Sequence, residues 1–319
     1  MVTFSFELFP PRTAAASLAL SLALDHLVAA GPEFVSVTYG ANGSSRESSL
    51  AVLGDLLARG VNPMAHLTCV GSSIIDEKRI IREFLEVGIT SFLALRGDPP
   101  EGHPAEESFL GELRSASELV QLIHHVQGEK EQYRLVDVPG TPSAKRLRSP
   151  EKVTIAVAAF PNGHPRSRSS SQDVDTLLAK QAAGANLAIT QLFFHPDDYL
   201  GFVDNARAAG VTLRIVPGIM PITGVRQLHR IVELTGEPMP TGILRALQAF
   251  DSVEAQLDLG ITRATALAAE VLDGGADGLH LYTFNRHEAV LGVLAGVGLI
   301  DLSRTISPGS RGSRTKENV

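Results

Sequence analysis

A repeated unit, a short strand followed by a helix, constrains the fold of this chain more than any other feature of its sequence. Short runs rich in β-branched and aromatic residues alternate with helical patterns, which is typical of a parallel α/β sheet. Strands are expected near Thr3–Phe9, Phe34–Tyr39, Pro63–Cys69, Ser91–Arg96, Val153–Phe160, Ala188–Phe194, Thr212–Pro217 and Gly278–Phe284. Helices are expected between them, for example over Glu77–Val87, Ala116–Val126 and Val174–Ala183. Because eight strands close a (β/α)8 barrel, the repeat predicts this α/β fold.

An open, doubly wound sheet is the alternative architecture for such a repeat. It usually carries a glycine-rich first turn, and neither G-x-G-x-x-G nor G-x-x-x-x-G-K-[ST] occurs in the 319 residues. A chain of this length fits one large barrel. We therefore expect a single barrel domain over residues 1–300, with a surface insertion at 127–152 and a disordered polar tail at 301–319.

The charge and the cysteine content exclude several classes of protein. The chain has 28 Lys and Arg against 35 Asp and Glu, a net charge of −7, which argues against a dedicated nucleic-acid binder. A single cysteine, Cys69, excludes an intramolecular disulfide framework. No apolar run is long enough to span a membrane. The stretch Ala14–Leu24 resembles a signal-peptide core but lacks a basic segment before it, so we expect a buried amphipathic helix and a cytoplasmic protein.

The segment Gln127–Lys152 interrupts the strand–helix repeat. It contains the charged triplet Glu129–Glu131, a Pro-Gly pair and the basic run Lys145–Arg148. This composition favours a surface excursion between the fourth helix and the fifth strand. For the basic run, a solvated loop is favoured over an anion-binding site.

The first expected strand carries a carboxylate in a position suited to catalysis. In (β/α)8 barrels the active site lies at the C-terminal ends of the strands. Alternation along the strand places Ser5, Glu7 and Phe9 on one face, while the other face is apolar and suited to packing against helices. We therefore expect Glu7 in the barrel lumen near this end, with a raised pKa that suits a general acid. An ion-paired structural glutamate is the alternative.

Polar residues also occur at the ends of other expected strands. They lie in the segments Thr38–Gly43, His66–Cys69, Arg96–Pro100, Thr190–Gln191 and Tyr282–Arg286. Each segment alone is compatible with a turn or a surface pair. Together, however, they place polar groups around one rim of the barrel, which predicts a binding site there.

Metal chemistry and nucleophilic catalysis receive little support from the sequence. The pair His124 and His125 falls on an expected helix without a carboxylate motif nearby, and H-E-x-x-H is absent. The G-x-S-x-G nucleophile motif is also absent. Cys69, on an expected strand, is interpreted as a small buried residue rather than a nucleophile.

Seven segments, taken in order, make the chain resemble the methylenetetrahydrofolate reductases. They are Phe4–Thr13, Phe34–Asn42, His66–Cys69, Ala94–Asp98, Ala183–Phe194, Val216–Pro221 and Leu281–Arg286, and they span residues 3–298 with gaps. The resemblance implies a flavin-containing (β/α)8 barrel. In that family hydride passes from NAD(P)H to FAD and then to methylenetetrahydrofolate, and the methyltetrahydrofolate formed feeds methionine synthesis.

The resemblance also implies roles for individual residues. Glu7 matches the general acid that helps open the imidazolidine ring of the folate, and Asp98 matches the carboxylate beside the flavin and pterin. Substrate contacts carry over to Gln191, Tyr282, Phe284 and Arg286. Flavin contacts carry over to Thr38, Ala41, His66, Arg96, Gly97, Asp98, Ala116, Phe160, His164, Asp173, Lys180 and Ile189. Family members are often homo-oligomers, no metal or nucleic-acid partner is implied, and no ribose-reading motif distinguishes NADH from NADPH.

Four positions depart from the family pattern. Ser115 and Phe160 stand where tyrosines are common, and Val225 replaces an aromatic residue that stacks on substrate. The family residue that faces this aromatic is often Leu and is Phe284 here, so we expect stacking from the opposite wall. The lost hydroxyls and the insertion keep open a flavin-free reductase that passes hydride directly from nicotinamide to the folate. A pterin-binding methyl-transfer barrel and an inactive folate-binding barrel are further alternatives.

Overall fold

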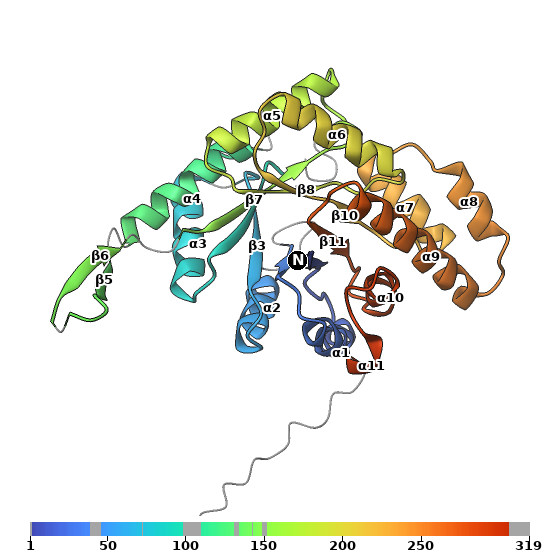
Figure 1. Cartoon of the computed structure of the whole chain (residues 1–319), viewed down its shortest axis with the longest axis horizontal. Coiled ribbons are helices and arrows are strands. Elements are labelled where there is room, and N and C mark those ends of the chain that lie inside the picture. The colour runs from blue at the N-terminus through green and yellow to red at the C-terminus, as the bar shows by residue number, and fades with distance from the viewer. Residues whose placement is uncertain are drawn as a thin grey trace, which may run out of the picture.

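The strand–helix repeat folds into a barrel of parallel strands enclosed by helices (Figure 1). The computed structural model describes residues 2–38, 46–71, 73–97, 110–130, 134–141, 143–148 and 152–305. The strands of the wall are β1 (Thr3–Leu8), β2 (Phe34–Val37), β3 (Pro63–Thr68), β4 (Ser91–Leu95), β7 (Thr154–Ala159), β8 (Leu187–Thr190), β9 (Arg214–Val216), β10 (Gly218–Ile219) and β11 (Gly278–Tyr282). The helices are α1 (Ala14–Ala29), α2 (Arg46–Ala58), α3 (Ile74–Glu86), α4 (Ala116–Lys130), α5 (Ser170–Ala182), α6 (Pro196–Ala208), α7 (Val225–Thr235), α8 (Thr241–Gln248), α9 (Val253–Asp273), α10 (Glu288–Gly296) and α11 (Leu302–Thr305). The predicted (β/α)8 fold is confirmed.

The barrel closes through the segment that contains β9 and β10. The strand order is β10-β11-β1-β2-β3-β4-β7-β8-β9, so the two ends of the sheet are neighbours in the sequence. Only Pro217 separates β9 from β10, and a proline has no N–H group to donate to a strand ladder. Its carbonyl still accepts a hydrogen bond from the His280 N–H (2.9 Å). The predicted strand Thr212–Pro217 therefore corresponds to β9 alone, and β10 follows it as a further short strand. Because the two ends of the sheet meet here, the open doubly wound sheet is excluded.

Two layers of apolar side chains hold the barrel together. The outward residues of each strand, such as Phe4, Phe6 and Leu8 in β1, join the main core beneath the helices. The inward residues form a separate cluster inside the lumen: Phe34, Met64, Leu93, Ala156, Leu187, Ile189 and Val216. This division follows the alternation of side chains along a strand. It confirms the prediction that the phenylalanine-bearing face of β1 packs outward.

Polar contacts close the N-terminal end of the barrel around Arg214. Its guanidinium contacts Asp277 and Glu33 (both 2.9 Å) and donates to the Thr3 hydroxyl (2.6 Å). Gly278 leaves room for it, because a Cβ there would lie 2.6 Å from the Arg214 side chain. Since this end is occupied by protein, a substrate has to enter from the C-terminal ends of the strands.

The apolar stretch Ala14–Leu24 forms the first part of α1, as predicted, but the helix is not amphipathic. Leu20 and Leu24 are buried, whereas Leu18 and Leu22 are 66% and 59% exposed. The expectation of a buried amphipathic helix is therefore corrected to a helix that is apolar on its exposed face as well. Within the described ranges, no helix has the length and apolar character required to cross a membrane.

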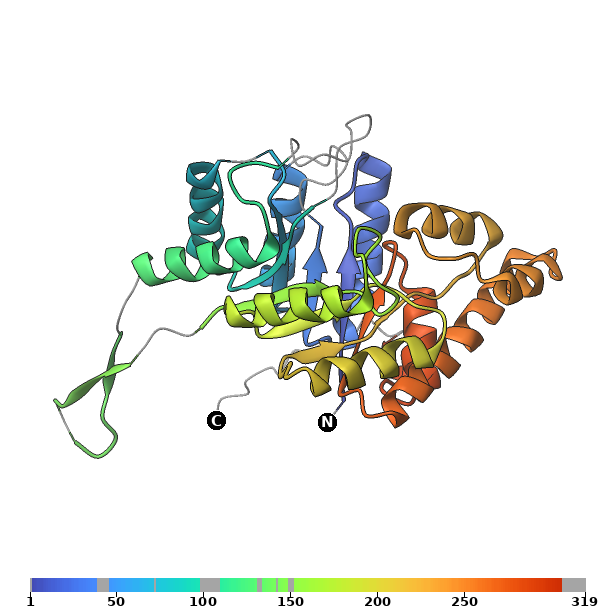
Figure 2. The ribbon, with the colours of Figure 1, turned by 90° about the horizontal axis from the view of Figure 1, so that it is seen from above.

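The predicted surface insertion contains an antiparallel hairpin of β5 (Arg134–Asp137) and β6 (Lys145–Arg148). Figures 1 and 2 both show the hairpin projecting away from the barrel. Its strands pair only with each other, in a two-stranded sheet with Asp137 opposite Lys145. The basic run is therefore a strand and not the expected loop. At the other end of the chain, α11 falls within the predicted tail, and residues 306–319 lie outside the described ranges.

Candidate active site

Inside the barrel, the Glu7 carboxylate lies among three other buried polar side chains, Ser5, His66 and His280, which we call with it the acid cluster. Glu7 Oε2 lies 3.7 Å from His66 Nε2 and 3.8 Å from His280 Nε2. These are ion-pair rather than hydrogen-bond distances, and neither Nε2 has a hydrogen-bond partner among the described residues. The Ser5 hydroxyl lies 2.8 Å from His280 Nδ1. Strands β1, β3 and β11 thus gather one carboxylate and two imidazoles in the lumen.

The acid cluster shifts the pKa of Glu7 in the direction opposite to the one predicted from the sequence. Burial alone raises this pKa, but the interactions with His280 and His66 outweigh burial, and the pKa of Glu7 lies below its ordinary value. Burial also lowers the pKa of His66 to about 4, against the attraction of Glu7. The expected raised pKa is therefore wrong, because alternation along β1 does not reveal which groups face Glu7 from β3 and β11.

Tyr282, a predicted substrate contact, forms part of the wall beside the acid cluster. Its hydroxyl donates to the Thr190 carbonyl (2.8 Å), and its ring meets the His280 ring edge-on at 5.2 Å. A Cβ at Gly218 would lie 2.2 Å from the Thr190 carbonyl oxygen and 2.7 Å from the tyrosine ring, so only glycine fits there. Because the hydroxyl already bonds to the backbone, Tyr282 is available to a substrate mainly through its ring. Burial and Glu7 raise the pKa of Tyr282 well above its ordinary value.

Gln191 lies at the end of β8, on the rim where the sequence analysis expects it. Its backbone N–H donates to the Ala159 carbonyl (2.8 Å), which continues the pairing of β8 with β7. Its side-chain Oε1 accepts a hydrogen bond from the Leu192 N–H (2.9 Å). This short internal bond orients the side-chain amide and leaves its NH2 group as the donor for a ligand.

Phe284 and Arg286 lie on the turn that follows β11. Phe284 is 38% exposed, adopts a left-handed backbone conformation (φ +50°), and packs against Phe9 with ring centres 5.6 Å apart. Asn285, also left-handed (φ +60°), bonds to both the N–H and the carbonyl of Phe9 (2.9 and 2.8 Å). A left-handed conformation is uncommon outside glycine, and here the Asn285 bonds to the end of β1 hold it. Arg286 follows with an exposed side chain.

A second polar group, which we call the cofactor cluster, contains Phe160, His164, Asp173 and Lys180. These residues come from the loop after β7 and from α5. Asp173 Oδ1 accepts bonds from the His164 N–H (3.2 Å) and from the Ser167 hydroxyl (2.6 Å). Asp173 Oδ2 is buried and has no partner among the described residues. One carboxylate oxygen is thus held by the protein while the other is left for a donor.

Lys180 is the buried cation of the cofactor cluster. Its Nζ donates to the Ala158 carbonyl (2.7 Å) and lies 5.9 Å from the centre of the Phe160 ring. Burial lowers the pKa of Lys180 to about 8, although Asp173 opposes this effect. The ammonium group is therefore largely protonated at neutral pH and still has donors for an anionic ligand.

The other predicted flavin contacts come from the C-terminal parts of β2, β4 and β8 and from the start of α4. Thr38 follows β2, Arg96 and Gly97 follow β4, Ala116 begins α4, and Ile189 lies in β8. Only glycine fits at position 97. Its backbone is left-handed (φ +83°), and a Cβ there would lie 2.5 Å from the Val70 side chain. Ala41 and Asp98 lie outside the described residues.

The structure gives local roles to two positions that depart from the family pattern. The Ser115 hydroxyl accepts a bond from the Glu118 N–H (3.2 Å), as an N-cap residue of α4 does. The Phe160 ring meets the His164 ring edge-on, with centres 4.7 Å apart. Both residues are thus built into the local structure without the tyrosine hydroxyl.

Cys69 and the neighbouring pair His124 and His125 belong to neither cluster. Cys69 is buried, and burial raises its pKa to about 12, so its thiol is a poor nucleophile, as predicted. His124 Nε2 lies 2.9 Å from the Gly184 carbonyl oxygen, and His125 pairs with Glu129 at 2.9 Å. A search of the described residues finds no group of three or more side chains suited to holding a metal ion.

His280 is the functional candidate that the sequence analysis missed. The pattern Gly278–Tyr282 contained a signal for it, because alternation places His280 on the same face as Tyr282. His66, a predicted flavin contact, lies within ion-pair distance of Glu7. Its role is therefore tied to the acid cluster as well.

Comparisons with known proteins agree with the family resemblance and with the barrel fold. The family model described as methylenetetrahydrofolate reductase matches residues 1–298. A probable methylenetetrahydrofolate reductase (NADH) of Oryza sativa subsp. japonica is 35% identical over 99% of this chain, but the match covers 52% of the rice protein. The chain thus spans about half the length of that relative. The 5,10-methylenetetrahydrofolate reductase of Escherichia coli (strain K12) is 31% identical, over 93% of this chain and 91% of its own length.

A solved structure supports the same architecture at lower sequence similarity. An uncharacterized protein from Clostridium thermocellum, which binds two copies of 5-methyl-5,6,7,8-tetrahydrofolic acid, has a TM-score of 0.58 to this chain. It is 11% identical, and the match covers 93% of each chain. At this identity the likeness concerns the fold alone.

Proposed function

Because this chain belongs to the methylenetetrahydrofolate reductase family, we propose that it reduces methylenetetrahydrofolate to methyltetrahydrofolate with NADH as the source of hydride. NADH is chosen over NADPH because the plant relatives are named for it. The observation that carries the proposal is the acid cluster, a buried carboxylate with two imidazoles at the end of the barrel where substrates bind. Such a site suits a reaction in which a proton has to reach one nitrogen of a bound folate.

We assign the general acid to Glu7 and the supply of its proton to His280. Since the pKa of Glu7 is lowered, its carboxylate is ionised at neutral pH and has to be protonated within the cluster. His66, with a pKa of about 4, is neutral at pH 7 and cannot be the donor. His280 lies 3.8 Å from Glu7 through Nε2 and contacts the Ser5 hydroxyl through Nδ1, so we propose this row of side chains as the route of the proton. Glu7 then protonates the departing N10 of the folate, which opens the ring to the reactive iminium.

The cofactor cluster fits a flavin. The unpartnered Asp173 Oδ2 is an acceptor for a hydroxyl of the ribityl chain, and Lys180 is a buried cation for a phosphate oxygen. The family resemblance also assigns to FAD the residues Thr38, Ala41, His66, Arg96, Gly97, Ala116 and Ile189. When bound, FAD supplies the acceptor for the hydride of NADH and the donor for the folate. Asp98 is assigned beside the flavin ring by the same resemblance.

We assign substrate positioning to four residues at the ends of β8 and β11. The Gln191 amide is oriented by its bond to the Leu192 N–H and is suited to the pterin. The Tyr282 and Phe284 rings offer apolar surfaces for stacking. Arg286, exposed at the mouth of the barrel, is suited to the carboxylates of the folate glutamate.

The visible spectrum of the purified protein tests this function. A yellow protein that NADH bleaches, and that methylenetetrahydrofolate recolours, is the expected result. A colourless protein that oxidises NADH only when methylenetetrahydrofolate is present would support the flavin-free reductase instead. A protein inert in both assays would overturn the reductase proposal and leave a folate-binding or methyl-transfer barrel.

We also propose that the methyltetrahydrofolate formed supplies methionine synthesis in the cytoplasm, and that the active protein is a homo-oligomer. These statements rest on the family resemblance. Growth of a reductase-deficient methionine auxotroph after expression of this chain tests the first. The mass of the purified protein in solution tests the second.

A further inference from the structure

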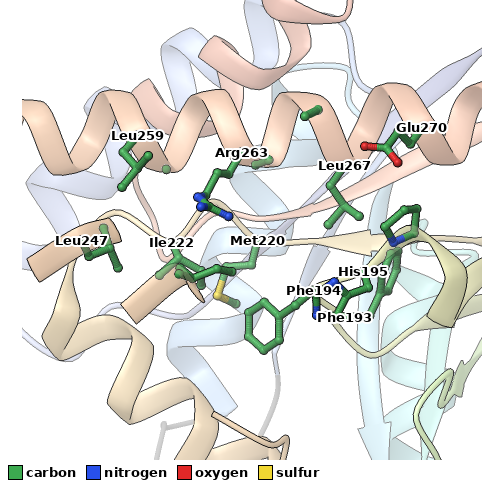
Figure 3. Close-up of a pocket in the computed structure, with 15 residues that line it drawn as sticks. Phe193, Phe194, His195, Met220, Ile222, Leu247, Leu259, Arg263, Leu267 and Glu270 are labelled. Carbon is green, nitrogen blue, oxygen red and sulfur yellow. The ribbon is translucent and has the colours of Figure 1, made fainter. Parts of the chain in front are cut away.

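A cavity of about 240 Å³ lies outside the barrel lumen, between α8, α9 and the segments that follow β8 and β10. Its walls include Phe193, Phe194, Met220, Ile222, Leu259 and Leu267 (Figure 3). Three helices, α7, α8 and α9, connect β10 to β11, and α9 crosses close to the Ile222 backbone. A Cβ at Gly260 would lie 2.4 Å from the Ile222 carbonyl oxygen, so glycine permits this crossing. The cavity shares no residue with the acid cluster or the cofactor cluster.

The Arg263 side chain lies beside this apolar cavity. In Figure 3 the Arg263 side chain extends from α9 toward Ile222 and Met220, over the cavity. Among the described residues, no carboxylate lies within ion-pair distance of Arg263. Glu270, on the same helix, lies at one end of the cavity, about 10 Å from Arg263 along the helix axis at roughly 1.5 Å per residue. The cavity therefore has apolar walls and, between Leu259 and Leu267 of α9, an exposed guanidinium with no carboxylate partner among the described residues.

We propose that this cavity binds a small apolar carboxylate, with its anionic group on Arg263 and its hydrocarbon body among the phenylalanine, methionine and leucine side chains. A guanidinium binds a carboxylate through two parallel hydrogen bonds, which are stronger than bonds between neutral groups. A phosphate, which carries more charge, fits less well, because one cation faces it and Glu270 repels it. The charge and the apolar walls thus select a monoanion with an apolar body.

The volume limits the size of the ligand. Sites for drug-sized molecules measure roughly 300–1,000 Å³, and this cavity is smaller than that range. A ligand with one ring and a short carboxylate chain matches this space. Phenylbutyrate is therefore a suitable probe, and phenylbutyramide is its neutral counterpart of the same shape.

Isothermal titration of the full chain with these two probes tests the site without any turnover. Phenylbutyrate is expected to bind at least tenfold more tightly than phenylbutyramide. Arg263→Met is expected to weaken phenylbutyrate binding at least tenfold and to leave phenylbutyramide binding within about twofold. Ala266→Trp, at an exposed residue that lines the cavity, is expected to abolish binding of both probes. Thermal melting of each variant checks that it is folded.

Arg245→Met is the matched control, because Arg245 is an exposed guanidinium on α8 that does not line the cavity. It is expected to leave both affinities unchanged. The proposal is overturned if phenylbutyrate does not bind, if it binds Arg263→Met as tightly as the parent chain, or if Arg286→Met rather than Arg263→Met removes binding. The last outcome would place the probe at the barrel mouth. None of these readouts depends on reductase activity, so failure of this site and failure of the proposed function are distinguishable.

Discussion

The acid cluster and the cofactor cluster use buried polar groups in opposite ways. In the acid cluster, Glu7 lies between two imidazoles at 3.7 and 3.8 Å, and no hydrogen bond joins it to either. In the cofactor cluster, Asp173 Oδ1 accepts two hydrogen bonds from the loop that precedes α5, and Oδ2 has no partner among the described residues. The first arrangement leaves titratable groups free to exchange a proton. The second holds an acceptor in place for a ligand.

This contrast predicts that substitutions in the two clusters separate proton transfer from cofactor binding. A change in the acid cluster should slow reduction of the folate and spare flavin content. A change in the cofactor cluster should release flavin and spare the chemistry of the molecules that retain it. Four substitutions, taken from the largest expected effect to the smallest, test the contrast.

Glu7→Gln should slow the folate half-reaction at least 100-fold, because a general acid contributes roughly a hundredfold to ten-thousandfold. NADH oxidation with an artificial acceptor should remain near the parent rate. Stopped-flow absorbance of each half-reaction separates the two. Ser36→Ala is the control, since Ser36 is buried opposite Glu7 in the β1–β2 register and is not a proton donor in the scheme. Equal slowing of both half-reactions would show that Glu7 is structural.

His66→Gln should remove much of the acid sensitivity of the fold. The pKa of His66 is about 4 in the folded chain against an ordinary 6.5, so the folded state binds fewer protons than the unfolded state between these values. Above about pH 6.5 the titration of His66 does not reduce the free energy of unfolding. As the pH falls toward 4, this group lowers the free energy of unfolding by about 3 kcal/mol. Urea unfolding at pH 7 and pH 4.5 measures the loss. The control is His229→Gln, at an exposed histidine on α7, which should leave this loss of stability unchanged.

Asp173→Asn should weaken flavin binding about tenfold to a hundredfold, because a bond to a charged acceptor contributes roughly 1.5–3 kcal/mol. The turnover of flavin-saturated enzyme should stay within a few-fold of the parent. Flavin fluorescence titration gives the affinity, and Asp175→Asn on the exposed side of α5 is the matched control. Unchanged flavin affinity would remove Asp173 from the cofactor site.

Phe284→Ala should raise the KM for the folate by a few-fold to about tenfold, since aromatic stacking contributes roughly 0.5–1.5 kcal/mol. The Phe284 ring is 38% exposed, and the family resemblance predicts that it replaces the stacking ring lost at Val225. Steady-state kinetics measure the change, and Phe284→Tyr should restore the parent KM. An unchanged KM in Phe284→Ala would refute the idea that the stacking ring has moved from one wall to the other.

Much of the site was predictable, and the reason lies in local patterns. Alternation along β1 was enough to place Glu7 in the lumen, and the strand ends were enough to place Gln191, Arg96 and Phe284 on one rim. Strand β10 and the hairpin β5–β6 were not predicted. Strand β10 has two residues and follows Pro217 directly, and each hairpin strand has four, so these segments are too short for a clear alternation of apolar and polar residues.

The sequence by itself determined the repeat of strand and helix, the face of each strand that turns inward, and the family to which the chain belongs. These properties depend on side chains a few residues apart, whose spacing is visible in the chain. Only the tertiary structure decided that His280 faces Glu7 and that the pKa of Glu7 is lowered. Such effects are electrostatic and act through space over a few ångströms. Residues more than 270 positions apart in the sequence become neighbours only when the barrel closes.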